Sequence, residues 1–262
     1  MDTWRFLKLE ANDAFTNMAI DEAILIAKIR ALVPNTLRVY CWKPSAVSVG
    51  KFQRVEKEVQ MKHCGQLGID IVRRITGGGA VFHAALGEVT YSVVASKDEL
   101  GGDVGRVYSR IYSGLTHALG HIGVSADFNE GNAKACPNLT VNDRKISGSA
   151  QCHKGGVVLQ HGTILISVDL MEMFNCLRVP WTRNCMEIAK VAKHKITSLK
   201  DELGRNIPTS EIEEALRKGF EQILDRKFVA SKLSAFESVT AETLRVQKYI
   251  TADWNIHAKS AG

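Results

Sequence analysis

The residues best suited to chemistry form one uninterrupted run from Arg73 to His83. Two arginines end an apolar segment, three consecutive glycines (Gly77, Gly78 and Gly79) follow, and a second apolar segment then begins. Glycines leave backbone N–H groups bare and accept positive φ, and such amides beside a fixed positive charge form an anion cradle. The run therefore predicts a nucleotide phosphate site. The alternative is an ordinary glycine-rich hairpin loop with two solvated arginines.

A second candidate segment, 142–151, contains Lys145 followed by small residues. A lysine on a short strand can place its ammonium against a phosphate or against the charge that develops between a carboxylate and a phosphate. By itself, the segment is also compatible with an exposed strand lysine. The third candidate is His161 in the apolar run 157–168, a setting that is more typical of a buried core histidine than of a catalyst.

The remaining sequence motifs limit which kinds of site the chain could contain. Neither GxxxxGK[ST] nor the GxGxxG of a dinucleotide fold occurs, so a nucleotide would have to bind through a different architecture. His117 and His121 have helical metal-ligand spacing, but no adjacent glutamate or third ligand accompanies them, so no metal site is assigned. The six cysteines include no CxxC pair, and Cys136, in a polar loop ahead of Lys145, is the best placed to be a nucleophile. The alternative is a bystander thiol.

The elements that must position these residues come as clusters of strands with flanking helices. This order favours an α+β fold with a mixed or antiparallel sheet flanked by helices, and not a regular βαβ alternation. With 262 residues, 45% of them hydrophobic, we expect one domain over residues 1–262. Helices are predicted over 13–31, 54–65, 104–121, 169–176, 197–203, 208–224 and 239–247, and strands over 37–42, 46–49, 69–74, 88–94, 139–141, 145–146 and 157–168.

The net charge and the distribution of charged and apolar residues limit the kinds of binding partner that we expect. The net charge is +6, which fits an anionic ligand or an acidic protein partner. No block of like charges or basic tail supports nucleic-acid binding, so no nucleic-acid partner is expected. No apolar run is long enough to span a membrane and the polar N-terminus is unlike a signal peptide, so we expect a cytoplasmic protein without a membrane partner.

Taken together, the three candidate segments resemble the lipoate–protein ligase family. Arg-Arg-x-Thr-Gly-Gly-Gly-Ala-Val-Phe-His, Asp-Arg-Lys-Ile-Ser-Gly-Ser-Ala and His-Gly-Thr occur in the family's order and approximate spacing, and the resemblance covers nearly the whole chain. Weaker matches are the 37–42 strand with Gly50 and Gln53, and Trp254 with Asn255. The resemblance implies a biotin/lipoate-ligase-like catalytic domain.

The resemblance also implies an activity. Lipoate would be activated by ATP to lipoyl-AMP, with Mg²⁺, and the lipoyl group would pass to a lysine of an acceptor protein. Lys145 would be the catalytic residue, in contact with both the lipoate carboxylate and the α-phosphate. The implied ATP-binding residues are Arg74, Gly77, Gly78, Gly79, Ala80, Val81, Phe82 and Lys145. The implied lipoate-binding residues are Gly77, Val81, His83, Lys145 and His161, with Phe82 as a further candidate wall.

Departures from the family pattern affect these expectations. The usual Asp and Gly-Asn after the histidine are replaced by Ala84 and by Gly87 with Glu88, and Cys136 and Asn138 stand where arginine and aspartate are common. We expect the C-terminal accessory domain of familiar members to be absent, and the resemblance would then imply a separate accessory polypeptide for the activation step. The implied acceptors are lipoyl domains of 2-oxoacid dehydrogenase E2 components and the glycine-cleavage H protein.

Three other interpretations stay open. Octanoyl- and lipoyltransferases of related fold use a cysteine nucleophile and no ATP, and here that nucleophile would be Cys136. A biotin ligase is a further relative, although its glycine-rich motif differs in sequence. A non-enzymatic basic RNA- or protein-binding module would explain the charge, but it would leave the glycine run and the Lys145 segment without a purpose.

Overall fold

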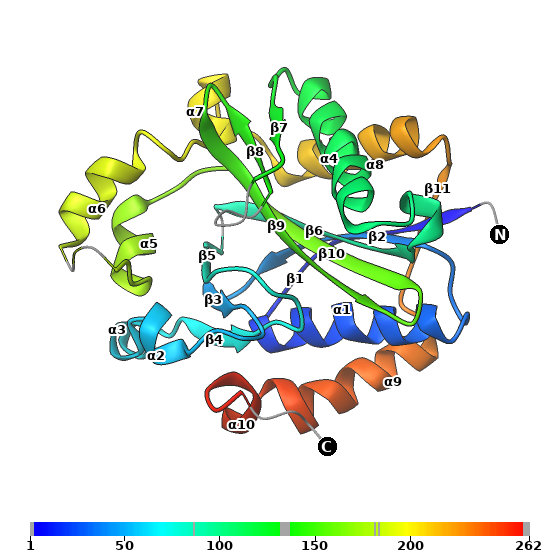
Figure 1. Cartoon of the computed structure of the whole chain (residues 1–262), viewed down its shortest axis with the longest axis horizontal. Helices are drawn as coiled ribbons and strands as arrows, with labels where there is room; N and C mark the ends of the chain where they lie inside the picture. The colour runs from blue at the N-terminus through cyan, green and yellow to red at the C-terminus, as the bar shows by residue number, and fades with distance from the viewer. Residues whose placement is uncertain (1–2, 86, 132–136, 181, 183, 259–262) are drawn as a thin grey trace.

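A mixed eight-stranded sheet forms the centre of the protein (Figure 1). The computed structural model describes residues 3–85, 87–131, 137–180, 182 and 184–258. The strand order is β11-β1-β2-β6-β10-β9-β8-β7, with β1 parallel to β2 and β11 and the other pairs antiparallel. These strands are β1 (Trp4–Asn12), β2 (Thr36–Trp42), β6 (Glu88–Ser96), β7 (Asp127–Asn129), β8 (Asn138–Val141), β9 (Arg144–Lys154), β10 (Val157–Leu165) and β11 (Phe228–Ser231).

Helices cover both faces of this sheet because side chains alternate along its strands. In β2, Leu37 and Val39 face a core built with α4 (Val104–His121) and α8 (Thr209–Leu224). Tyr40 and Trp42 face the opposite core, built with α1 (Ala14–Ile29) and α9 (Ala235–Leu244). The α1 helix begins where the Asp13 side chain accepts a hydrogen bond from the Thr16 amide at 2.6 Å. After α9 the chain continues through the π-helical segment η2 (Arg245–Tyr249) to α10 (Ala252–Asn255).

A second, three-stranded sheet lies beside the first, with the order β4-β3-β5. It has its own hydrophobic core, which includes Val47, Phe82, Met173 and Cys176. The strands are β3 (Ala46–Val49), β4 (Asp70–Arg73) and β5 (Val81–His83), and the neighbouring helices are α2 (Val55–Glu58), α3 (Met61–Leu67), α5 (Leu170–Cys176) and α6 (Cys185–Ala192). The α7 helix (Leu199–Leu203) packs instead on the core of the large sheet. A short 3₁₀ helix, η1 (Asp98–Leu100), precedes α4.

The predicted α+β class and the mixed sheet with flanking helices are confirmed. Several boundaries were wrong. The helix predicted over 54–65 is two helices, the strand predicted over 145–146 is the eleven-residue β9, and β1, β7, β11, α6 and α10 were not predicted. Within the described residues, no helix combines the length and apolar character needed to cross a membrane.

Candidate functional site

A cavity of about 280 Å³ lies between the small sheet and the central strands of the large one. It is close in size to the smaller pockets that bind compact ligands. Its open end is formed by the exposed Gly78 and Gly79 of the glycine loop and by the exposed Lys145, and we call these three residues the cavity mouth. The remaining lining is mostly apolar and includes Met18, Trp42, Val81, Phe82, Leu165, Met173, Phe174, Leu177 and Ile196.

The Arg74 guanidinium is buried beneath the glycine loop, and its donors point into the protein. It donates to the Ser48 carbonyl and hydroxyl at 2.9 and 2.7 Å, and to the Gly77 and Gly79 carbonyls at 2.9 Å each. Its Nε contacts the Thr76 hydroxyl at 3.4 Å. A guanidinium has five N–H donors, and these five contacts occupy all of them. Arg74 therefore fixes the shape of the loop and has no donor left for a phosphate.

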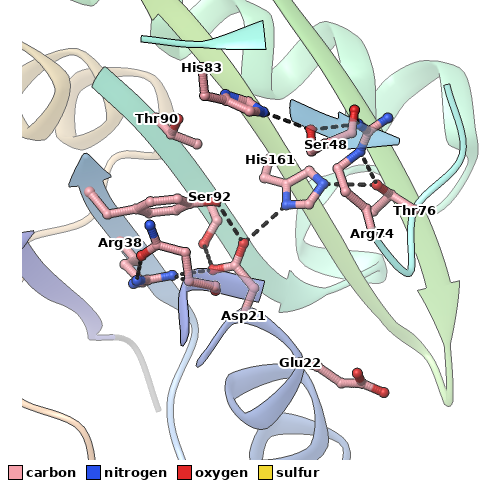
Figure 2. Close-up of polar contacts among 12 residues, drawn as sticks. Asp21, Glu22, Arg38, Ser48, Arg74, Thr76, His83, Thr90, Ser92 and His161 are labelled. Atoms are coloured by element: carbon pink, nitrogen blue, oxygen red, sulfur yellow. Dashed lines mark hydrogen bonds and ion pairs between the residues drawn. The ribbon is translucent and has the colours of Figure 1, made fainter. Parts of the chain in front are cut away.

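A chain of hydrogen bonds runs from Glu88 through His83 and Ser48 to Arg74, and Figure 2 shows its part from His83 to Arg74. Glu88 Oε1 lies 2.7 Å from His83 Nδ1, and His83 Nε2 lies 2.6 Å from the Ser48 hydroxyl, which Arg74 contacts in turn. The His83 ring stacks on Trp42 with centroids 3.9 Å apart. Glu88, a departure from the family pattern, is thus the carboxylate that orients His83.

A second chain of hydrogen bonds runs from Asp21 through His161 and Thr76 to the same guanidinium (Figure 2). Asp21 Oδ2 lies 3.0 Å from His161 Nδ1, and His161 Nε2 lies 2.8 Å from the Thr76 hydroxyl. Arg38 donates to Asp21 at 2.7 Å. Burial raises the pKa of Asp21, but the charges and hydrogen bonds of Arg38 and His161 together outweigh it, so the net pKa is lowered. Burial lowers the pKa of His161 despite Asp21, which favours the neutral imidazole.

The backbone of Lys145, at the cavity mouth, is held on one side by residues 195–197. Its amide donates to the Lys195 carbonyl at 2.8 Å, and its carbonyl accepts from the Thr197 amide at 3.0 Å. A Cβ at Gly148 would lie 2.6 Å from the Lys145 ammonium. Because Gly148 has no side chain, it leaves the space that the Lys145 side chain occupies.

The structure brings together most of the residues predicted from sequence. Gly77 does not line the cavity, and it contributes its carbonyl to Arg74. Sequence reasoning missed Asp21, Ser48, Thr76 and Glu88 as site residues. The cavity-lining residues among those predicted are Arg74, Gly78, Gly79, Ala80, Val81, Phe82, His83, Lys145 and His161.

Cys136, the predicted nucleophile of the transferase alternative, lies outside the described residues, but Pro137 directly after it lines the cavity. No cysteine among the described residues does so. Burial raises the pKa of both Cys41 and Cys152 to about 11, which disfavours the thiolate form of either. The others are Cys64 and Cys176, buried in the core of the small sheet, and Cys185, which donates to the Phe174 carbonyl.

Comparisons with solved structures show the fold. The chain superposes with a TM-score of 0.87 and 28% identity on a bi-partite lipoate protein ligase from Thermoplasma acidophilum, over 100% of this chain and 99% of that one. A structure of lipoate-protein ligase A bound with ATP gives a TM-score of 0.85 at 27% identity, over 98% of this chain and all of that one.

The relatives found by sequence comparison are named for a different activity from that of the ligase structures. Octanoyltransferase LipM of Kyrpidia tusciae is 39% identical, with 97% of this chain and 99% of that protein covered. Octanoyltransferase LipM of Moorella thermoacetica is 35% identical, with 97% of each covered. These relatives are more similar in sequence than the ligase structures and match over their full length.

This finding overturns the expected ATP-dependent ligase reaction through lipoyl-AMP, and with it ATP and Mg²⁺ as cofactors. The geometry supplies a reason, because Arg74, expected to hold the nucleotide, uses its donors on Ser48, Thr76 and the loop carbonyls. The alternative of octanoyl transfer without ATP fits the relatives better. Residues 13–221 match the lipoyl protein ligase A/B catalytic domain. Together with the full-length relatives, this match shows that the chain belongs to that family.

Proposed function

We propose that this protein transfers an octanoyl group from a thioester donor to the ε-amine of a lysine on a lipoyl-type acceptor domain. The observation that carries the proposal is the full-length similarity to octanoyltransferases, at 39% identity. A free carboxylate does not form an amide spontaneously, so without ATP the acyl group has to arrive already activated, and a thioester meets that need. An accessory polypeptide for an activation step is then not required, and we expect transfer without one.

The acyl chain would occupy the cavity. Its apolar lining, with Trp42, Val81 and Phe82, suits a saturated hydrocarbon chain, which contributes no charge that the walls would have to balance. His83 and His161 would lie along this chain. Each is held by a carboxylate on one side and a hydroxyl on the other, so neither ring has to find a partner in the ligand.

Cys136 would be the nucleophile, since no cysteine of the described ranges lines the cavity and Pro137 does. Its thiolate would attack the donor carbonyl, the donor thiolate would leave and take up a proton, and an octanoyl-cysteine thioester would remain. The neutral acceptor amine would then attack this thioester, lose a proton, and release the Cys136 thiolate.

Lys145 would assist both steps. An ammonium at the cavity mouth lowers the pKa of a nearby thiol and stabilises the oxyanion of each tetrahedral intermediate. Its position is fixed by the backbone bonds to Lys195 and Thr197 and by the space above Gly148. Lys145 thus stays the proposed catalytic residue, but in an acyl transfer and not in an ATP-dependent ligation.

The acceptors we propose are the E2 lipoyl domains and the glycine-cleavage H protein. The net charge of +6 would favour association with acidic domains of this kind. A single catalytic domain over residues 1–262 and a cytoplasmic location stay predictions.

The test is acyl-enzyme formation followed by intact-protein mass spectrometry. The wild-type chain is incubated with an octanoyl thioester of N-acetylcysteamine, with and without ATP, and then with an apo lipoyl domain. We expect one octanoyl adduct that hydroxylamine removes, no dependence on ATP, and transfer to the domain. Cys136→Ala should abolish the adduct, while Cys152→Ala, the matched control, should retain it.

Two results would refute the proposal at different points. An adduct that persists in Cys136→Ala would place the nucleophile at another residue. Transfer that requires ATP and starts from free octanoate would refute the transferase reaction itself.

A further inference from the structure

Phe52 is an unusual surface residue. Its side chain is 84% exposed, the highest value among the exposed large hydrophobic residues of the described chain. Single exposed hydrophobic residues are normal on protein surfaces. The position of Phe52 and its fixed backbone are what make it informative.

The turn that carries Phe52, residues 50–53, packs directly on the glycine loop. A Cβ built on Gly50 would lie 2.1 Å from the Gly78 carbonyl oxygen, so the two backbones are in contact. The Lys51 amide donates to the Thr76 carbonyl at 2.8 Å. The turn therefore lies beside the cavity mouth and is hydrogen-bonded to the segment that forms it.

A buried guanidinium holds this turn in one conformation. Arg73, which is completely buried, donates to the carbonyls of Gly50, Lys51 and Gln53 at 3.0, 3.1 and 2.7 Å. The Gln53 side chain also accepts from the Gly50 amide at 2.9 Å. An exposed aromatic residue on a fixed turn loses little backbone entropy when a partner covers it.

A positive charge lies beside Phe52. The Lys51 ammonium lies 5.5 Å from the Phe52 ring centroid, and Lys51 and Lys154 are both exposed. Burial lowers the pKa of Lys248, the Glu22 carboxylate opposes this shift, and the charges of Lys154 and Lys51 lower the pKa further. The neighbouring carboxylate of Glu22 is already bound by Lys248 at 2.7 Å. The exposed Lys51 ammonium thus gives the surface beside Phe52 a positive charge.

We propose that Lys51 and Phe52 form the docking surface for the acidic domain that carries the acceptor lysine. This inference rests on the proposed octanoyl transfer. The acceptor lysine has only a four-carbon stem, so the folded surface that presents it has to come against the cavity mouth. A thioester donor on a flexible arm has no such requirement. Phe52 supplies the apolar contact, and Lys51 pairs with a carboxylate of the acceptor.

The experiment separates docking from chemistry by changing the acyl acceptor. Phe52→Ala and Lys51→Glu are compared with wild type and with Val239→Ala, whose parent side chain is 69% exposed on α9. Each protein is acylated with octanoyl-N-acetylcysteamine and then treated with either hydroxylamine or an apo E2 lipoyl domain. Binding of the lipoyl domain is measured separately by isothermal titration.

Acylation and hydroxylamine cleavage should be unchanged in every variant. For the lipoyl domain, Phe52→Ala should lower kcat/KM about tenfold, as for a contact at the centre of an interface. Lys51→Glu should lower the rate further at low salt and reduce its salt dependence. Val239→Ala should match wild type in all assays.

Wild-type transfer and binding by both variants would overturn the docking assignment. So would an equal loss with hydroxylamine, because the turn would then act on the shape of the site and not on the acceptor. A wild-type chain that binds the lipoyl domain through Phe52 but forms no acyl-enzyme would refute the proposed function and leave the docking surface in place.

Discussion

Gly50 controls the shape of the cavity mouth although it does not line the cavity. A Cβ at this position would lie 2.1 Å from the Gly78 carbonyl oxygen and 3.1 Å from two further backbone carbons of the glycine loop. Real Cβ contacts are essentially never shorter than 3.0 Å. Gly50→Ala therefore requires the loop or the turn to move by about 1 Å, and both are backbone.

The displacement predicts separate losses in activity and in stability. A misplacement of ~1 Å in a reacting geometry costs on the order of 100-fold in rate, and we expect acyl-enzyme formation to fall by about that factor. Overpacking costs about 1–3 kcal/mol. For a chain of this size, that corresponds to a Tm lower by roughly 2–10 °C.

The control is Gly77→Ala in the same loop. A Cβ at Gly77 meets no atom within 4 Å, and its φ is not in the left-handed region. This variant should keep the wild-type Tm and lose little activity. Single-turnover acylation by mass spectrometry and thermal unfolding by circular dichroism measure the two effects. Wild-type acylation by Gly50→Ala, or an equal loss in Gly77→Ala, would refute the steric argument.

Three further changes probe the polar network. Arg74→Lys should slow acylation roughly 10- to 100-fold with the fold retained by circular dichroism, because three ammonium donors cannot replace a five-donor fork. The pKa of His161 is lower in the folded protein than in the unfolded chain, where it is about 6.5. The stabilisation that His161 contributes is therefore complete above this pH and is lost as the pH falls. Urea titrations from pH 7 to 5 should therefore show a slope of up to ~1.4 kcal/mol per pH unit that His161→Asn removes. Asp21→Asn, which leaves Arg38 buried without its carboxylate, should cost about 3–5 kcal/mol in urea unfolding, and Asp21→Asn/Arg38→Met should cost less.

Locally determined elements were predictable from sequence. The α4 helix matches its predicted range of 104–121, because an amphipathic stripe and an N-cap at Asp103 define it without help from distant residues. The helix predicted over 54–65 failed for the opposite reason. Val59 is extended there and forms a bridge with Leu177, so a contact 118 residues away divides the helix in two.

The β9 strand shows the same limit. Its central residues, Ser147, Gly148 and Ser149, have no alternating apolar pattern, so only 145–146 was predicted as strand. The structure extends it over Arg144–Lys154 because it is paired with β8 on one side and β10 on the other. Tertiary pairing overrides a weak local preference here.

Part of the site could be read from the sequence and part could not. The motif residues converge on one cavity, as their types suggested. Asp21 did leave a signal, since it is a carboxylate with Met18, Ile24 and Leu25 at helical spacing, and a charge in such a stripe is buried only when paired. Glu88 was noted only as a departure from the family. Its hydrogen bond to His83 depends on a strand pairing that the sequence does not specify.

The ligase and transferase alternatives could not be separated by the motifs, because both keep the glycine run and the lysine. In this chain, the directions of the cationic donors suit a transferase better than an ATP-dependent ligase. Of the lining residues that the structure describes, Arg74 and Lys145 are the arginine and the lysine, and the five Arg74 donors are engaged within the protein. A triphosphate needs several cationic donors directed at it. An octanoyl chain needs an apolar wall and one positive group at its reactive end, and the described cavity provides that arrangement, with Lys145 at its mouth.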